Sequence, residues 1–275
     1  MGSVSTVRED GKVAAGARVG TTTIIPCFDD PDGLRRAVRS VRDQDEDCEL
    51  IVVDDGSAAS EAAVISEIGR NCQATVIRLP RQSGPGAARN AGIEASSGRY
   101  LAFLDADDVW LPGKLALQRS EMDRRGLVFS YMRYANVNRG RVRPMPAPEH
   151  LSQWALLRNT AVGCSTVMLR RDFLGDRRFP NAPCEDFALW VELLGDGEQA
   201  HLIGQEIAVL RYAGGRSRNK FVAAWRHWRT VRDTLNTPFL PAFAQFASYA
   251  TRAAHKHWRP GGDRPIDKRI GGFEP

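Results

Sequence analysis

Residues Tyr100–Asp108 read YLAFLDADD, an apolar run that ends in a turn containing three aspartates. An upstream segment, Leu50–Ser57, repeats this arrangement, because the run LIVV is followed by DDGS. Each run has the length of a buried strand and carries its carboxylates at its carboxyl end. Open α/β sheets bind ligands at that end of their strands, so we expect both acidic ends to face one crevice.

Strands and helices are predicted to alternate around these two runs. Apolar strand patterns occur at 21–25, 49–53, 74–79, 100–104 and 127–131. Helical spacing of apolar residues follows Pro31 and recurs at about 59–69, 86–96 and 112–125. This alternation is typical of a parallel sheet with right-handed crossovers. The predicted fold class is α/β, with a mostly parallel central sheet flanked by helices.

The second half of the chain is less regular. Helices are predicted near 149–158, from about Asp186 to Leu194 and over most of the last sixty residues, with strands at 165–169 and 206–212. We divide the chain into a flexible leader at 1–20, a first subdomain at 21–125, a second subdomain at 126–215, and a basic loop with C-terminal helices at 216–275. The proline-rich stretch 143–148 is the strongest break in the pattern.

Composition narrows the class of protein. The 275 residues are 43% hydrophobic, which suits a globular chain with a substantial core. Five cysteines without a C-x-x-C pair indicate neither a disulfide framework nor a zinc cluster. The N-terminus lacks the apolar segment of a signal peptide, and no stretch has the length of a membrane span. We expect a cytoplasmic protein with no nucleic-acid partner.

Four motifs in order resemble those of family 2 glycosyltransferases: TIIPCFDD at Thr23–Asp30, IVVDDGS at Ile51–Ser57, GPGAARNAG at Gly84–Gly92 and LDADD at Leu104–Asp108. A fifth, CEDFALW at Cys184–Trp190, is similar to the family's Glu-Asp segment. The resemblance covers roughly residues 21–215. It implies a Rossmann-like GT-A fold, a nucleotide-diphosphate sugar donor, a divalent cation and inverting transfer to an acceptor hydroxyl. It also implies that the subdomain at 21–125 binds the nucleotide-sugar and the subdomain at 126–215 binds the acceptor.

Clustered carboxylates at one strand end repel each other unless a cation lies between them, which by itself indicates a Mg²⁺ or Mn²⁺ site. Asp107 is the first choice of ligand. By resemblance Asp105 lies against the donor's ribose or the metal, while Asp108 ligates the metal or orients a ligand. A strand-end aspartate can also simply cap the next helix, but three of them within four residues favour the metal.

The donor's base and ribose are expected to contact Asp54 and Asp55, above a wall shaped by Pro26 and Phe28. An Asx turn would explain this Asp-Gly-Ser sequence equally well if it stood alone. The guanidinium of Arg89 is expected to bind the donor's phosphate or sugar hydroxyls. The alternative is that Arg89 lies on the helix surface and forms a salt bridge. Phe28 and the aspartate after it depart from the family's frequent Tyr and Asn.

By resemblance, Asp186 is the catalytic base, and Glu185 and Trp190 are assigned to the acceptor site. A favourable interaction of Asp186 with the helix dipole is the structural alternative. The basic segment containing Arg218 and Lys220 resembles the family's loop that folds over the diphosphate. The predicted acceptor is a glycan, a lipid-linked intermediate or another small molecule.

The C-terminal segment combines aromatic residues with arginines. Phe221, Trp225, Trp228, Val231 and Leu235 recur at helical spacing. The pattern favours a helix packed on the catalytic core, and peripheral contact with the inner face of the cell membrane is the alternative. A nucleotidyltransferase and a non-catalytic sugar-binding relative are the alternative functions. Against the first, the glycine-rich loop expected after the first strand is absent, and against the second, Asp107 and Asp186 are both present.

Overall fold

The computed structural model describes residues 20–158, 162–212, 220–235 and 264–265. The first half alternates strands with helices: β1 (Thr21–Cys27), α1 (Pro31–Arg42), β2 (Glu49–Asp54), α2 (Ala59–Asn71), β3 (Thr75–Arg78), α3 (Pro85–Ala95), β4 (Tyr100–Phe103), β5 (Asp108–Trp110) and α4 (Lys114–Arg125). The predicted strands and helices of this half are confirmed, with ends that differ by at most two residues, and the short strand β5 was not predicted.

The second half mixes short elements with two long strands: β6 (Phe129–Asn138), β7 (Arg141–Pro144), β8 (His150–Leu151), α5 (Gln153–Leu157), a 3₁₀ turn η1 (Cys164–Thr166), β9 (Val167–Arg170), α6 (Arg171–Leu174), α7 (Glu185–Leu193), a 3₁₀ turn η2 (Leu194–Asp196), β10 (Ala200–Tyr212), α8 (Lys220–Arg229), a π-helical turn η3 (Thr230–Thr234) and β11 (Arg264–Pro265). The proline-rich stretch begins in β7, which forms a hairpin with β6.

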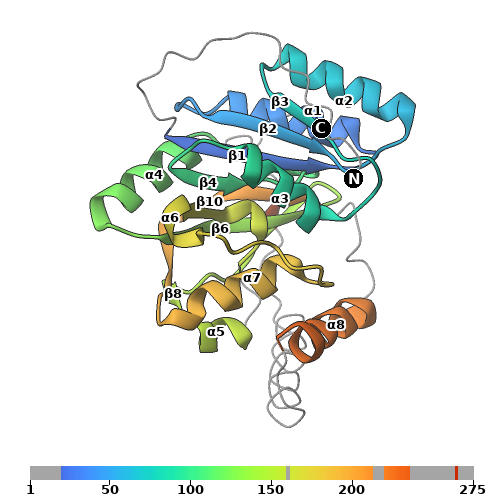
Figure 1. The fold of residues 1–275 in the computed structure, drawn as a ribbon. Coiled ribbons are helices and arrows are strands. Elements are labelled where there is room, and N and C mark those ends of the chain that lie inside the picture. Colours follow the sequence, from blue (N-terminus) through green and yellow to red (C-terminus); the bar gives the residue numbers. More distant parts are fainter. Residues whose placement is uncertain (1–19, 159–161, 213–219, 236–263, 266–275) are drawn as a thin grey trace.

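One sheet connects both halves, in the order β11-β7-β6-β9-β4-β1-β2-β3 (Figure 1). Strands β4, β1, β2 and β3 are parallel to one another, as predicted. Strand β9 lies antiparallel between β4 and β6, and β10 pairs parallel with β6. The α/β fold class with a central sheet flanked by helices is therefore confirmed, and the same sheet runs through both predicted subdomains.

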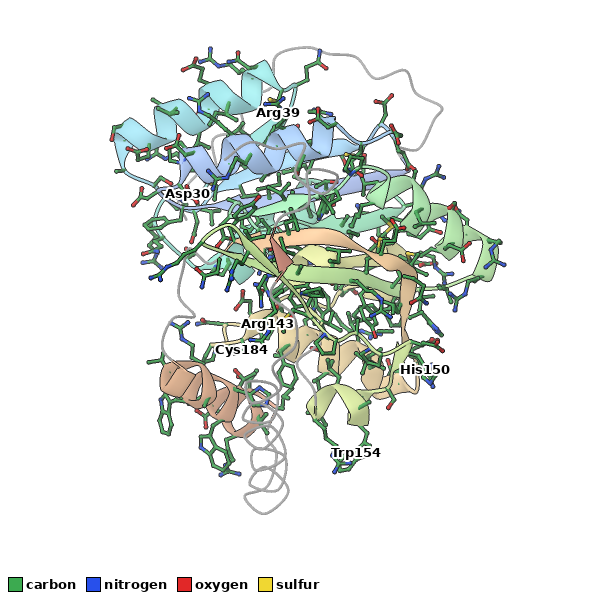
Figure 2. All side chains as sticks on the ribbon, turned by 180° about the vertical axis from the view of Figure 1, so that it is seen from behind. Asp30, Arg39, Arg143, His150, Trp154 and Cys184 are labelled. Atoms are coloured by element: carbon green, nitrogen blue, oxygen red, sulfur yellow. The ribbon has the colours of Figure 1, made fainter. Side chains whose placement is uncertain are left out.

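Two predicted elements were wrong in part. The segment predicted as a helix at 149–158 begins as strand β8, which contains His150, and becomes helical at Gln153, so that Trp154 lies on a helix (Figure 2). The strand predicted at 165–169 starts as the turn η1 and pairs only from Val167. Both segments are short, and periodicity alone does not separate strand from helix at that length.

The strands place alternate side chains on opposite faces of the sheet. Ile24 and Leu101 face a core that also contains residues of α3 and α7. Ile25 and Ala102 face a second core, formed with α1 and α4. Because the central parallel strands are covered on both faces, β2 is apolar from Leu50 to Val53 and β4 is apolar throughout. The sheet is thus held rigidly, and the turns at its carboxyl end have fixed positions.

The backbone of α3 lies close against β1. A Cβ added at Gly92 would come within 2.5 Å of the Ile24 side chain, so this contact requires a glycine. The close packing fixes the helix whose first turn carries Gly86 and Arg89. The motif Gly84–Gly92 therefore has a packing role besides any contact with a ligand.

The apolar stripe predicted for the C-terminal helix packs against the core only in part. Val231 is buried and Trp228 and Leu235 pack partly against the core, but the indole of Trp225 is 61% exposed. His227 and Thr230 are buried instead. The π-helical turn at 230–234 adds a residue to one turn, which changes the phase of the helix relative to the predicted apolar stripe.

Within the described residues, no helix is both long enough and apolar enough to cross a membrane.

Candidate active site

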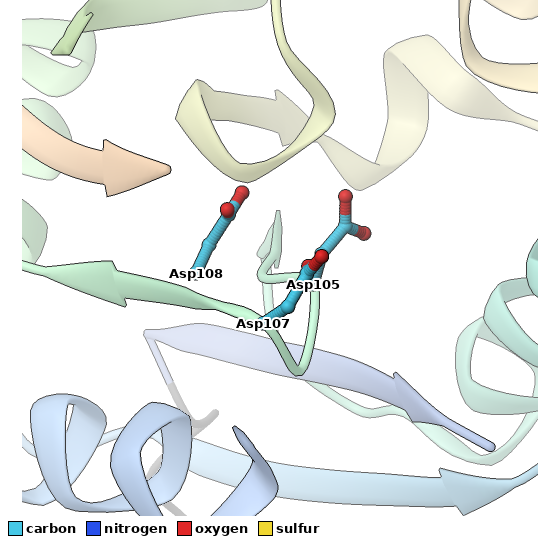
Figure 3. Close-up of side chains that lie close together, drawn as sticks. All are labelled: Asp105, Asp107 and Asp108. Atoms are coloured by element: carbon cyan, nitrogen blue, oxygen red, sulfur yellow. The ribbon is translucent and has the colours of Figure 1, made fainter. Parts of the chain in front are cut away.

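The three aspartates that follow β4 lie together in a tight turn at the carboxyl end of the sheet. The backbone N–H of Asp108 donates to the carbonyl of Asp105 at 3.0 Å, which closes the turn. One carboxylate oxygen from each of Asp105, Asp107 and Asp108 lies within 4.8 Å of the others (Figure 3). The sequence prediction of a carboxylate cluster at this strand end is confirmed.

The electrostatics of this turn favour a bound cation. Burial, followed by the nearby charge of Asp105, raises the pKa of Asp107. Burial also raises the pKa of Asp108 to about 7, although Arg211 opposes the shift. A divalent cation would offset the repulsion among these groups, and carboxylate oxygens are the ligands that Mg²⁺ and Mn²⁺ prefer. The residues present therefore fit such an ion.

Asp108 differs from its two neighbours in its contacts. Its side chain is 2% exposed, and its Oδ2 atom accepts a hydrogen bond from Ser165 and lies 3.3 Å from Nε of Arg211. Asp105 and Asp107 are less buried. This arrangement favours Asp107 and Asp105 as ligands and Asp108 as the residue that orients them, which is one of the two roles predicted for it.

The loops that follow β1 and β2 are bonded to each other and to the start of α3. The Asp54 carboxylate accepts from the backbone N–H of Ser57 at 2.9 Å. The two oxygens of Asp55 accept from the backbone N–H groups of Ser83 and Gly84, at 2.7 and 2.9 Å. Both aspartates thus have a local structural task, and contact with the donor's base and ribose stays a prediction.

The two wall residues differ in exposure. Pro26 is buried within β1 and pairs with Val53 of β2. Phe28 follows the strand and is 36% exposed, so of these two residues only Phe28 has a side chain that a ligand could contact.

Replacing Asp55 by asparagine is expected to lower the free energy of unfolding by about 1–3 kcal/mol. The amide keeps one acceptor oxygen but turns an NH₂ group toward the second backbone donor, which loses its partner. Urea denaturation measures the change. Asp47→Asn, an exposed aspartate in the loop before β2, is the control. An unchanged midpoint for the Asp55 variant would show that the two bonds add nothing to stability.

Arg89 joins the turn at 105–108, called the acidic turn below, to the start of α7. Its side chain is 3% exposed, with one terminal nitrogen 2.5 Å from Asp105 and the other 2.8 Å from Glu185. The guanidinium also lies 5.3 Å from the ring centre of Phe179. The two carboxylates are 80 positions apart in the sequence and are brought together by one planar cation. A direct contact between Arg89 and the donor stays a prediction.

Asp186 stands next to this bridge in the first turn of α7. Its Oδ1 atom accepts from the backbone N–H of Phe187 at 2.8 Å. Burial and then the neighbouring charge of Glu185 raise the pKa of Asp186 to about 6, against the opposing effect of Arg89. A carboxylate with this pKa is ionised at neutral pH and is still basic enough to take a proton.

Trp190 is not available to an acceptor in this structure. Its side chain is 0% exposed and packs against Phe103, Phe129 and Phe179 at ring-centre distances of 5.3–6.1 Å. The aromatic cluster anchors α7 on the sheet, so we correct the predicted role of Trp190 from acceptor contact to core packing. Arg218 and the side chain of Lys220 lie outside the described residues, and their predicted contact with the diphosphate stays a prediction.

Two residues of the site were missed at the level of sequence. Ser165 and Arg211 contact the acidic turn from η1 and β10. Both lie in segments where only a strand pattern was visible, and nothing in their local sequence distinguishes them. A cavity of about 420 Å³ lies elsewhere, between α5, α7 and η3; none of its lining residues belongs to the acidic turn. We assign it no part in the chemistry.

The chain is similar in sequence to known glycosyltransferases. The family model described as glycosyl transferase family 2 matches residues 22–178. A Bacillus subtilis (strain 168) protein, assigned by name to teichuronic acid biosynthesis as the glycosyltransferase TuaG, is 33% identical over 86% of this chain and 96% of its own. The Escherichia coli UDP-Glc:alpha-D-GlcNAc-diphosphoundecaprenol beta-1,3-glucosyltransferase WfgD is 29% identical over 85% of this chain and 93% of its own.

Solved structures share the fold at lower identity. The Staphylococcus aureus TarS fragment in complex with UDP superposes with a TM-score of 0.63 at 17% identity, covering 86% of this chain and 72% of that one. The mannosyltransferase PcManGT of Pyrobaculum calidifontis, in complex with GDP-Man and Mn²⁺, gives a TM-score of 0.58 at 16% identity, covering 90% and 77%.

Proposed function

This chain belongs to glycosyl transferase family 2, and on that premise we propose that it moves a sugar from a uridine-diphosphate donor to a hydroxyl of a lipid-linked acceptor, with inversion and with a divalent cation. That it is a glycosyltransferase follows from the family and replaces the nucleotidyltransferase and non-catalytic alternatives. The donor, acceptor, metal and stereochemistry are the proposed part.

The observation that carries the proposal is the bridge made by Arg89. The guanidinium bonds Asp105 of the acidic turn on one side and Glu185 on the other, so Asp186 is held beside the turn. Two features therefore lie side by side at one edge of the sheet. One is a cluster of carboxylates that fits a cation, and the other is a separate carboxylate, Asp186, with a raised pKa. Single displacement requires this pair, since one group must neutralise the leaving diphosphate while another deprotonates the acceptor.

Asp107 and Asp105 would hold the cation, which supplies Lewis-acid stabilisation of the diphosphate leaving group when bound. Asp108, fixed by Ser165 and Arg211, orients the turn. The loops bearing Asp54 and Asp55 are proposed to take the nucleoside, with Phe28 as the exposed ring of that wall.

Asp186 accepts the proton of the attacking hydroxyl. Attack from the side opposite the diphosphate then forms the new glycosidic bond as the sugar–phosphate bond breaks, and the anomeric configuration inverts. Glu185 is neutralised in part by Arg89 and orients the first turn of α7. Because the family relatives WfgD and WfaP are named for a diphosphoundecaprenol acceptor, we propose a lipid-linked acceptor here. Peripheral membrane contact, and contact of the donor's diphosphate with the basic segment containing Arg218 and Lys220, belong to the same proposal.

A thermal-denaturation panel of UDP, UDP-sugars, GDP and GDP-sugars, each with Mn²⁺ or with EDTA, tests the donor. A uridine nucleotide with Mn²⁺ at 100 times its dissociation constant should stabilise the protein by about 2.7 kcal/mol, and EDTA should remove most of this gain. The acceptor is tested by transfer from the best donor to a sugar-diphosphoundecaprenol. Stabilisation by guanosine nucleotides alone would contradict the proposed donor, and stabilisation unaffected by EDTA would contradict the metal.

A further inference from the structure

The side chain of Ser165, which is not part of the acidic turn, is hydrogen-bonded to both ends of it. The residue lies in η1 and is 1% exposed. Its hydroxyl donates to Oδ2 of Asp108 at 2.5 Å and accepts from the backbone N–H of Asp105 at 3.1 Å. One side-chain oxygen is therefore bonded to the first and the last residue of the four-residue turn.

The backbone that carries the Ser165 side chain is held in place by two buried hydrogen bonds. The carbonyl of Ser165 accepts from the indole N–H of Trp110 at 2.7 Å. The next carbonyl, that of Thr166, accepts from the side-chain amide of Gln118 at 3.1 Å, and both donors are fully buried. Since neither peptide group can shift without breaking a buried hydrogen bond, the hydroxyl is a fixed reference point for the turn.

Arg211, a residue of β10, is the second side chain that contacts Asp108. Its Nε atom lies 3.3 Å from the same Asp108 oxygen, and its guanidinium lies 5.4 Å from the ring centre of Tyr134. The positive charge favours an ionised Asp108, and the serine sets the direction in which that carboxylate points. Charge and direction are thus supplied by two different residues.

We infer that Ser165 is a positioning residue for the divalent cation: through its hydroxyl it keeps the carboxylates of the acidic turn close enough to bind one ion. This rests on the proposed metal site. Without the hydroxyl, Asp108 would lose the hydrogen bond that Ser165 donates and the N–H of Asp105 would lose its acceptor, so repulsion could separate the carboxylates. Residues that hold metal ligands in this way typically account for about 10–100-fold in metal affinity.

The test is calorimetric titration of Mn²⁺ into the full-length protein with saturating UDP. Ser165→Ala should raise the apparent dissociation constant for Mn²⁺ by about 10–100-fold. Ser165→Thr keeps the hydroxyl and should bind Mn²⁺ as the wild type does. Ser165→Cys fills a similar volume with a weak donor and should bind Mn²⁺ as weakly as the alanine variant does. If the alanine variant folds poorly, the cysteine variant is titrated in its place.

Thr22 offers a matched control at the opposite end of the sheet. Its buried hydroxyl also donates to a carboxylate, that of Glu49 at 2.5 Å, and accepts a backbone N–H, that of Gly98 at 2.9 Å. Thr22→Val removes an equivalent pair of bonds at constant size, far from the acidic turn. It should lower stability much as the Ser165 variants do and leave Mn²⁺ affinity unchanged.

The titrations distinguish a failure of the role assigned to Ser165 from a failure of the metal site itself. Equal Mn²⁺ affinity in wild type and Ser165→Ala, an equal loss in Thr22→Val, or no recovery in Ser165→Thr would each overturn the role of Ser165 while leaving the metal site standing. Absence of Mn²⁺ binding by the wild type with UDP would overturn the metal-dependent function and this inference together.

Discussion

Asp186→Asn is expected to lower the rate of sugar transfer by about 10²–10⁴-fold while donor affinity stays unchanged. Asparagine keeps the size of the side chain and an oxygen that can accept from the backbone N–H of Phe187, now at 2.8 Å. It cannot take a proton, so only the deprotonation of the acceptor is lost. Burial and Glu185 already oppose a negative charge at this position, so the neutral amide should not destabilise α7.

Transfer and donor binding are measured on the same purified variant. Glu192→Gln removes an exposed carboxylate from the same helix and should change neither quantity. Near-normal turnover in the Asp186 variant would eliminate this residue as the base. Joint loss of donor binding and of folding would show that its role is structural.

The wild-type pH profile should report the same group. The ionised form of Asp186 is the competent one, so transfer is fully present above its pKa and is lost as pH falls through about 6. A carboxylate with an ordinary pKa would preserve activity to lower pH. We expect the acidic limb to be absent from the residual activity of Asp186→Asn.

Asp107→Ala is expected to abolish the Mn²⁺-dependent binding of nucleoside diphosphate and therefore transfer. The raised pKa of Asp107, due to burial and then to Asp105, means that its ionised form is disfavoured in the folded protein without a cation. Removing the carboxylate relieves this cost, so the free energy of unfolding at pH 7 should not fall. The stabilisation of about 2.7 kcal/mol by saturating nucleotide and metal should disappear.

Calorimetry with UDP, with and without Mn²⁺, checks this result. Asp176→Ala, which removes an exposed aspartate from the loop after α6, is the control and should bind as the wild type does. Unchanged Mn²⁺-dependent affinity in the Asp107 variant would remove Asp107 from the site. A fall in stability larger than in the control would contradict the repulsion inferred for the acidic turn.

Local features of the sequence were sufficient for the α/β class and for the acidic strand ends. The apolar runs at 50–53 and 100–104 have strand length, and the helices between strands show their own spacing, so each element is encoded by residues close together in the chain. Because parallel strands point the same way, the carboxylates that follow them must share one edge. The acidic turn at 105–108 was therefore predictable without coordinates.

Contacts between distant segments were decided only by tertiary packing. Trp190 has the sequence context of a functional motif, yet the aromatic rings of Phe103, Phe129 and Phe179 enclose it. Arg89 resembled a ligand contact in the sequence, and in the folded chain it pairs with Asp105 and Glu185.

Sequence alone thus determined which elements form and which strand ends are acidic, since periodicity and turn composition act over a few residues. The tertiary structure decided which side chains meet: Ser165 with Asp105 and Asp108, and Arg89 with Glu185. These pairs are separated by 57 to 96 positions, and no local pattern records them. They form because the pairing of β9 and β10 within the sheet and the packing of α7 against it leave buried polar groups that must find partners where those elements meet.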